Sequence, residues 1–346
     1  MNFCLLLLYL ICFAYGDYQS PADAGPVIET SYGFVKGRYH RNASIFLGIP
    51  FAAPPIGRLR FQKPVDPNPW NGTLMADHYS PECAQILGEL EQSSEDCLYL
   101  NVFTPTDIAP MHRQHLPVLV RFHNGAYKNG AIADLSFDRL VSFVIAERIL
   151  FVSFNYRLNF HGFFTMKDHF PPNRGLWDQI HALNWIQNNI DKFGGEPSNV
   201  SVIGHDDGAS SIALLMYSPL SKGLLRRAIL HGGSPFSPWS ITANMSEHIS
   251  RRMAEALGCG VGLDTDGHFN ASVFDCISSV SEESIRNAWS ELLGQSNTDW
   301  IPHWTPVLDG SNGILPFSDL DGFTLRHPEE VEVVLGSSQK SRYGSM

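Results

Sequence analysis

Four short runs of this 346-residue chain are apolar on both faces, and they restrict the possible folds more than any other feature. Such runs are typical of strands in a parallel sheet that helices cover on both sides. The runs occupy residues 117–122, 149–154, 200–203 and 227–230. We therefore expect an α/β fold with a buried, mostly parallel sheet.

A helix is predicted between the second and third runs. Apolar residues recur there every three or four positions and form one stripe, which consists of Leu176, Ile180, Leu183, Ile186, Ile190 and Phe193. Gly194 and Gly195 end the pattern. A strand, a crossover helix and a parallel strand predict a doubly wound sheet flanked by helices. In such sheets ligands bind at the carboxyl ends of the strands.

Composition excludes several classes of protein. The formal net charge is -11 and no run of Lys or Arg is present, so we expect no nucleic-acid partner. With 44% hydrophobic residues the chain can form a packed core, and no repeat or linker divides it. We expect one domain over residues 17–346, with no cofactor and no metal.

Residues 1–16 are predicted to be a signal peptide. The apolar run from Phe3 to Phe13 is followed by small residues and then by a polar segment. The run is short for a membrane span, and no later stretch is long and apolar enough to span, so we expect no transmembrane span. These features predict a secreted, extracellular protein, or one at the cell surface if a longer, anchored form exists.

Cysteines and sequons agree with export. Four cysteines follow the predicted leader as two local pairs, and we expect disulfides between Cys83 and Cys97 and between Cys259 and Cys276. Expected glycosylation sites are Asn42, Asn71, Asn244 and Asn270, whereas a fifth sequon, Asn199, opens a strand that should be buried.

Several motifs occur in one order along the chain: residues 46–55 (FLGIPFAAPP), 95–102 (EDCLYLNV), 155–157 (NYR) and 175–179 (GLWDQ). With them the chain resembles the type-B carboxylesterase/cholinesterase family. This resemblance implies an α/β-hydrolase fold and identifies the two disulfides as the first two of the family. It also implies truncation at the C-terminus, since the domain of the family continues beyond Met346.

The resemblance places a nucleophilic serine in the turn Gly-x-Ser-x-Gly, the nucleophile elbow. Here that turn consists of Gly204, His205, Asp206, Asp207 and Gly208. Both glycines are kept, so we expect the elbow geometry to be kept as well. Asp206 brings a carboxylate where the family has a hydroxyl, and a carboxylate is a poor nucleophile for acyl transfer.

The resemblance also places an oxyanion hole at the backbone N–H groups of Gly125, Ala126 and Asp207. The charges of Asp206 and Asp207 would oppose an oxyanion there. The acid of the triad would fall near Ser341, where no carboxylate stands, and the triad histidine would lie beyond Met346. We therefore expect no catalytic residues, and both the elbow and the oxyanion hole to be vestigial.

From these residues we expect a catalytically inactive protein of the cholinesterase-like adhesion branch, similar to neuroligin and gliotactin. Residues 218–224 and 234–239 resemble that branch locally. The expected partner is an extracellular protein, with a homodimer as a further possibility. Two alternatives stay open: an atypical hydrolase that uses Asp206 on the elbow, and a nonfunctional fragment of a longer cholinesterase-like protein.

Overall fold

The structure is a computed structural model that describes residues 25–85, 93–106, 114–134, 136–166, 170–260, 271–294, 304–310, 313–317, 319 and 331–337. The predicted signal peptide, Asn270 and Ser341 lie outside the described residues.

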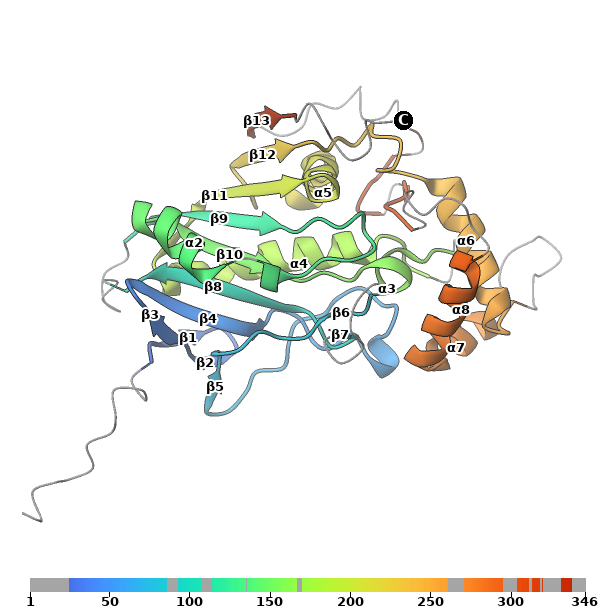
Figure 1. The fold of residues 1–346 in the computed structure, drawn as a ribbon, viewed down its shortest axis with the longest axis horizontal. Coiled ribbons are helices and arrows are strands. Elements are labelled where there is room, and N and C mark those ends of the chain that lie inside the picture. The colour runs from blue at the N-terminus through green and yellow to red at the C-terminus, as the bar shows by residue number, and fades with distance from the viewer. Residues whose placement is uncertain are drawn as a thin grey trace, which may run out of the picture.

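An eight-stranded sheet forms the centre of the molecule, in the order β13-β12-β11-β9-β10-β8-β4-β3 (Figure 1). Its strands are β3 (Arg38–His40), β4 (Ala43–Pro50), β8 (Tyr99–Pro105), β9 (Leu116–Phe122), β10 (Leu150–Phe154), β11 (Gly195–His205), β12 (Arg227–His231) and β13 (Glu332–Gly336). Neighbours from β13 to β10 run parallel, and β8, β4 and β3 join antiparallel. The expected mostly parallel, doubly wound sheet is thus confirmed.

The four apolar runs lie in β9, β10, β11 and β12. In register, Val120 of β9 pairs with Val152 of β10 on one side and with Val202 of β11 on the other. All three valines are fully buried, because strands at the centre of a doubly wound sheet are covered on both faces.

Smaller elements complete the N-terminal part. A three-stranded sheet contains β1 (Val27–Thr30), β2 (Gly33–Lys36) and β5 (Thr73–Met75), and a two-stranded sheet contains β6 (Glu82–Cys83) and β7 (Ser93–Ser94). The 3₁₀ turns are η2 (Gly57–Leu59), η4 (Ile132–Asp134), η5 (Ile145–Glu147), η7 (Ile190–Phe193) and η8 (Pro219–Ser221).

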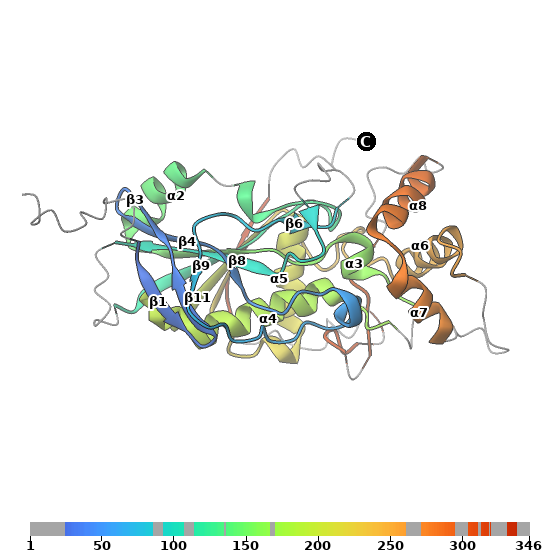
Figure 2. The same ribbon diagram turned by 90° about the horizontal axis from the view of Figure 1, so that it is seen from below.

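Helices cover both faces of the sheet, with α2 on one face and α4 on the other (Figure 2). The helices are α2 (Phe137–Phe143), α3 (Asn159–Phe163), α4 (Arg174–Asn189), α5 (Asp207–Tyr217), α6 (Ala243–Ala256), α7 (Ala271–Ser279) and α8 (Glu282–Gly294). Helices α6, α7 and α8 gather beyond the carboxyl ends of the parallel strands (Figure 1). They therefore border the edge where doubly wound sheets bind ligands.

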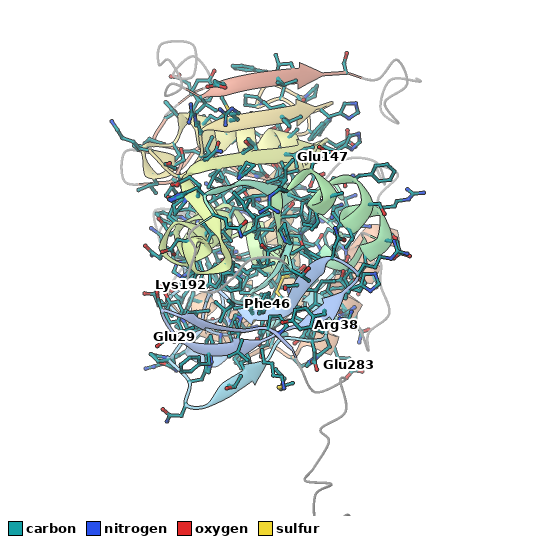
Figure 3. All side chains as sticks on the ribbon, turned by 90° about the vertical axis from the view of Figure 1, so that its left-hand side faces the viewer. Glu29, Arg38, Phe46, Glu147, Lys192 and Glu283 are labelled. Atoms are coloured by element: carbon teal, nitrogen blue, oxygen red, sulfur yellow. A yellow bond between two sulfur atoms is a disulfide. The ribbon has the colours of Figure 1, made fainter. Side chains whose placement is uncertain are left out.

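The predicted crossover helix is α4, and its apolar stripe continues into η7. Gly194 follows η7 with φ 88°, a left-handed conformation that glycine adopts without strain. The stripe belongs to the larger apolar core, while a smaller core lies under α2 on the opposite face. Side chains fill both sides of the sheet, and Phe46 of β4 is 1% exposed (Figure 3).

Both expected disulfides are present in the structure, Cys83–Cys97 and Cys259–Cys276. The second joins α7 to the chain just after α6.

The expected glycosylation sites differ in position. Asn42 and Asn71 are exposed, while the Asn199 side chain is half-buried and accepts a hydrogen bond from Arg227 Nη1 at 2.6 Å. Asn244 lies in the first turn of α6. None of the described helices combines the length and apolar character that a membrane span needs.

Candidate active site

The elbow lies where β11 ends and α5 begins, at the carboxyl edge of the sheet. Asp206 is the single residue between the two elements, and its backbone has φ 47° and ψ -115°. Its N–H donates to His231 O at 2.9 Å, and its carbonyl accepts from Ser210 N at 2.9 Å. A non-glycine residue in this conformation stores backbone strain, which is typical of functional sites.

The two flanking glycines allow this turn. A Cβ atom at Gly204 would lie 2.4 Å from the carbonyl carbon of Gly208, and one at Gly208 would lie 2.7 Å from Phe122 O. Both distances are too short for a side chain, so the turn closes only with glycine at both positions. The sequence-based expectation about the elbow backbone agrees with this geometry.

The side chain of Asp206 lies beside His205. Asp206 Oδ2 is 3.1 Å from His205 Nδ1, and the two side chains are 23% and 48% exposed. The His205 ring stacks on His231 with 4.7 Å between the ring centroids. Asn124 Nδ2 approaches His205 Nδ1 to 3.5 Å. A carboxylate, an imidazole and an amide thus meet at the open side of the elbow.

The loop that follows β9 faces the elbow with successive backbone N–H groups. Gly125, Ala126 and Tyr127 have φ 146°, 59° and 55°, so three residues in a row have positive φ. Successive backbone N–H groups in turn conformations can form concave nests that bind anions. Gly125 N and Ala126 N donate to Asp207 Oδ1 at 2.9 Å each, and Tyr127 N donates to Asp207 Oδ2 at 3.0 Å.

Asp207 is 0% exposed, and its carboxylate fills the nest. Burial raises the pKa of this carboxyl, and the N–H groups of Gly125, Tyr127, Ala126 and Asp207 itself oppose that rise. Gly125, Ala126 and Asp207 were expected from the family resemblance to form one anion site as N–H donors. The structure brings these residues together, and the Asp207 side chain is the acceptor.

A neutral aromatic layer supports the loop from below. The His123 ring stacks on Tyr156 with 4.2 Å between the centroids, and Tyr156 OH donates to His123 O at 3.0 Å. Burial, together with the charge of Arg121, lowers the pKa of His123 to about 3. His123 is therefore uncharged at neutral pH and positions the loop without adding charge.

An apolar cavity of about 500 Å³ lies next to the elbow. Side chains of α5, β12, β13 and the segment after β12 line it, and they include Met216, Leu230, Phe236 and Leu335. Gly232 lines the cavity and also borders the elbow, because a Cβ atom at this position would lie 3.2 Å from Asp206 Oδ1. A cavity of this size can hold a small organic molecule.

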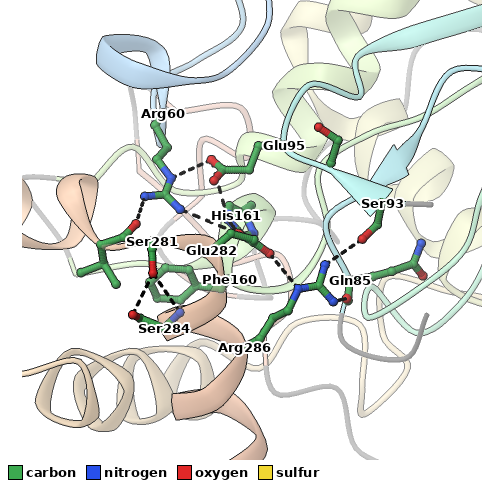
Figure 4. Close-up of polar contacts among 12 residues, drawn as sticks. Arg60, Gln85, Ser93, Glu95, Phe160, His161, Ser281, Glu282, Ser284 and Arg286 are labelled. Carbon is green, nitrogen blue, oxygen red and sulfur yellow. Dashed lines mark hydrogen bonds and ion pairs between the residues drawn. The ribbon is translucent and has the colours of Figure 1, made fainter. Parts of the chain in front are cut away.

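A second polar cluster lies between α8 and the Cys83–Cys97 loop (Figure 4). Ligand atoms of Glu95, His161 and Glu282 come within 4.8 Å of one another, so these side chains could hold a metal ion. However, Arg60 Nε lies 2.6 Å from Glu95 Oε2, and Arg286 Nε lies 3.5 Å from Glu282 Oε1. The guanidinium charges oppose a bound cation.

This cluster was not predicted from the sequence. Its members stand far apart in the chain, and only Glu95 belongs to a motif that was recognised. The elbow and the nest come from two loops at neighbouring strand ends, whereas the cluster depends on how α8 docks. The expected acid position near Ser341 lies outside the described residues.

The sheet and the strained elbow at the end of β11 define an α/β-hydrolase. The model of the carboxylesterase family matches residues 24–344, so this chain belongs to the carboxylesterase family. Acetylcholinesterase of Leptinotarsa decemlineata is 32% identical over 96% of this chain and 59% of its own length. Carboxylesterase 1E of Rattus norvegicus is 34% identical over 89% of this chain and 57% of its own length.

A solved structure gives the same result. The structure named PNB esterase is similar with a TM-score of 0.79 and 31% identity, over 92% of this chain and 65% of that chain. The chain spans about half the length of several curated relatives that it matches, for example 51% of gut esterase 1 of Caenorhabditis elegans.

Two expectations from the sequence are corrected here. We expected an inactive adhesion protein and no enzyme, but the relatives carry the names of enzymes, among them a medium-chain fatty acyl-CoA hydrolase of Anas platyrhynchos. The adhesion branch, the protein partner and the homodimer receive no support from the comparisons. The expectation of an inactive protein rested on the missing serine, acid and histidine of the family triad, and the enzyme names of the relatives overturn it.

Proposed function

We propose that this chain is a carboxylic ester hydrolase in which His205 and Asp206 activate water directly. The observation that carries the proposal is the strained elbow, which holds the Asp206 carboxylate 3.1 Å from His205 Nδ1 at the carboxyl edge of the sheet. The names of the relatives support ester hydrolysis as the reaction class.

In the proposed reaction, Asp206 accepts a hydrogen bond from His205 Nδ1–H, which leaves Nε2 free as the base. Nε2 takes a proton from water, and the water oxygen attacks the carbonyl carbon of the ester. The tetrahedral intermediate then breaks its bond to the alcohol oxygen, which receives the proton from His205. The products are a carboxylic acid and an alcohol, and the imidazole returns to its starting state.

Asn124 supplies a donor for the developing oxyanion in this proposal. Its amide is half-buried and lies beside the His205 imidazole, 3.5 Å from Nδ1. Side-chain amides perform this task in other hydrolases, where removing one donor lowers kcat by about 10²–10³-fold.

The cavity beside the elbow suggests the substrate class. Its wall is made largely of apolar side chains, and its volume is about 500 Å³. Esters with a short apolar acyl or alcohol group fit such a space. We propose neutral esters of this kind as substrates.

We further propose that the protein is exported. The apolar leader, the two disulfides and the exposed sequons at Asn42 and Asn71 support this proposal. Disulfides form and persist in oxidising compartments.

Hydrolysis of p-nitrophenyl butyrate by the purified, disulfide-intact chain tests the proposed function. Loss of the base in His205→Gln lowers kcat/KM by about 10²–10⁴-fold. Asp206→Asn lowers it at least roughly tenfold, because the imidazole loses the partner that fixes its tautomer. Asp138→Asn, on the surface of α2, serves as the control and leaves kcat/KM unchanged.

Two results would overturn the proposal. One is that the wild-type chain releases p-nitrophenol no faster than heat-denatured protein. The other is that His205→Gln keeps the wild-type rate. Turnover in H₂¹⁸O separates the roles of Asp206: direct activation of water leaves the carboxylate unlabelled, whereas a covalent intermediate on Asp206 introduces ¹⁸O into it.

A further inference from the structure

The nest of N–H groups opposite the elbow already holds an anion that belongs to the protein itself. Asp207 Oδ1 accepts from Gly125 N and Ala126 N, and Oδ2 accepts from Tyr127 N, over 2.9–3.0 Å. Three donors that could meet an external oxyanion are thus engaged.

We propose that Asp207 is a built-in plug, an autoinhibitory contact that closes this anion site and limits the hydrolytic activity. The part concerning activity rests on the proposed ester hydrolysis, whereas the plug itself does not. An oxyanion of the reaction and the Asp207 carboxylate compete for the same donors, and both are negative. Coulomb repulsion at a few ångströms in a poorly solvated site keeps the oxyanion out while the plug is in place.

Local geometry explains why the plug stays in place. Asp207 is the first residue of α5, where a negative side chain is favoured by the helix dipole. The nest has positive φ at Ala126 and Tyr127, a conformation that costs free energy in non-glycine residues. Hydrogen bonds to a carboxylate offset that cost. The same contact therefore stabilises the loop and blocks it.

Removal of the plug should create a site for a small carboxylate. Asp207→Ala deletes the carboxylate and keeps Cβ, so formate has the size of the missing group. Asp207→Asn is the matched control, because its side chain occupies the same space and its amide oxygen can still accept from Gly125 N and Ala126 N. We expect formate at ten times its Kd to raise the Tm of Asp207→Ala by about 2–4 °C, and to leave the wild type and Asp207→Asn unchanged.

The activity of Asp207→Ala provides the second readout. Freed N–H donors should raise kcat/KM for p-nitrophenyl butyrate by roughly tenfold or more, because oxyanion donors are among the strongest catalytic groups. A residue that only supports the loop would lower activity when removed. Formate binding without any ester hydrolysis would support the plug and count against the proposed function.

Two findings would overturn the plug: formate fails to stabilise folded Asp207→Ala in a saturable way, or it stabilises the wild type equally. If the variant does not fold, hydrogen exchange of the wild-type chain decides. The amides of Gly125, Ala126 and Tyr127 should be protected by the Asp207 carboxylate. Exchange of these amides at the rate of exposed loops would refute the contact.

Discussion

Asp178 on α4 and Asp207 at the start of α5 are both 0% exposed, but their charges meet different partners. Asp178 forms two hydrogen bonds with the Arg157 guanidinium, Nε to Oδ2 at 2.8 Å and Nη2 to Oδ1 at 2.7 Å. It also accepts from Arg157 N at 3.0 Å. Asp207 accepts from backbone N–H groups in a loop with positive φ.

The two carboxylates differ in how their negative charge is compensated. A guanidinium fork neutralises a buried carboxylate with a full opposite charge and fixed geometry. Backbone dipoles compensate less, and the pKa of Asp207 is accordingly raised by its burial. A buried charge with incomplete compensation is costly, and such residues cluster at functional sites. We therefore expect changes at Asp178 to affect stability, and changes at Asp207 to affect binding and rate as well.

Arg157→Ala should give the largest loss of stability. It leaves the Asp178 carboxylate buried without its cation, and such changes cost about 3–5 kcal/mol. Urea unfolding of the disulfide-intact chain measures the loss. Arg226→Ala is the control, because Arg226 is 54% exposed and lies 3.9 Å from Glu332, so it should cost less than about 0.5 kcal/mol. A loss below about 1 kcal/mol for Arg157→Ala would mean that Asp178 is not held by charge.

The pH dependence of stability tests the other side of the comparison. The pKa of Asp207 in the folded chain lies above its usual value of about 3.9, so the folded state binds this proton more tightly than the unfolded state. The stability that the protonated carboxyl contributes is therefore fully present below that usual value, and it is lost as the pH rises through the folded pKa. Asp207→Asn does not titrate there. The free energy of unfolding of the variant should therefore rise relative to that of the wild type as the pH increases above about 4. Unfolding midpoints at successive pH values measure this, and parallel curves for both proteins would contradict it.

Much of the fold follows from local sequence patterns. The runs in β9, β10, β11 and β12 and the stripe of α4 are periodic signals that a parallel sheet requires. The elbow backbone could also be predicted from the sequence, since two glycines flank the turn. The structure shows that neither Gly204 nor Gly208 has room for a Cβ atom. These features are encoded within a few neighbouring residues.

The side-chain contacts of the candidate site could not be predicted from local sequence patterns. Asp207 meets Ala126 across a separation of 81 residues, and the direction of its side chain depends on the twist of the elbow. The sequence therefore suggested that Asp207 supplies an N–H group, and its carboxylate was treated only as an unfavourable charge. The expectation that the chain has no enzymatic role rested on family positions where the serine, the acid and the histidine are missing, and the enzyme names of the relatives overturn it.

Glu282 on α8 offers the smallest effect, because it is intermediate between the two buried carboxylates. Its side chain is 30% exposed, and His161 Nε2 lies 3.0 Å from its Oε2 (Figure 4). Burial alone would raise the pKa of Glu282, but the charges of His161, Arg286 and Arg60 lower it. Its stabilising contribution is therefore present above the usual value of about 4.3, and it is lost as pH falls through the folded pKa.

Glu282→Gln should destabilise the chain by roughly 1 kcal/mol at neutral pH, since partial exposure screens these charges. The difference from the wild type should shrink as the pH falls toward 3. Glu283→Gln, at the exposed neighbouring position, should show neither effect and serves as the matched control. Urea unfolding at pH 7 and at lower pH measures both variants. An equal loss of stability at all pH values would show that packing of α8, and not charge, holds this carboxylate in place. The link between charge compensation and stability would then apply only to fully buried carboxylates such as Asp178 and Asp207.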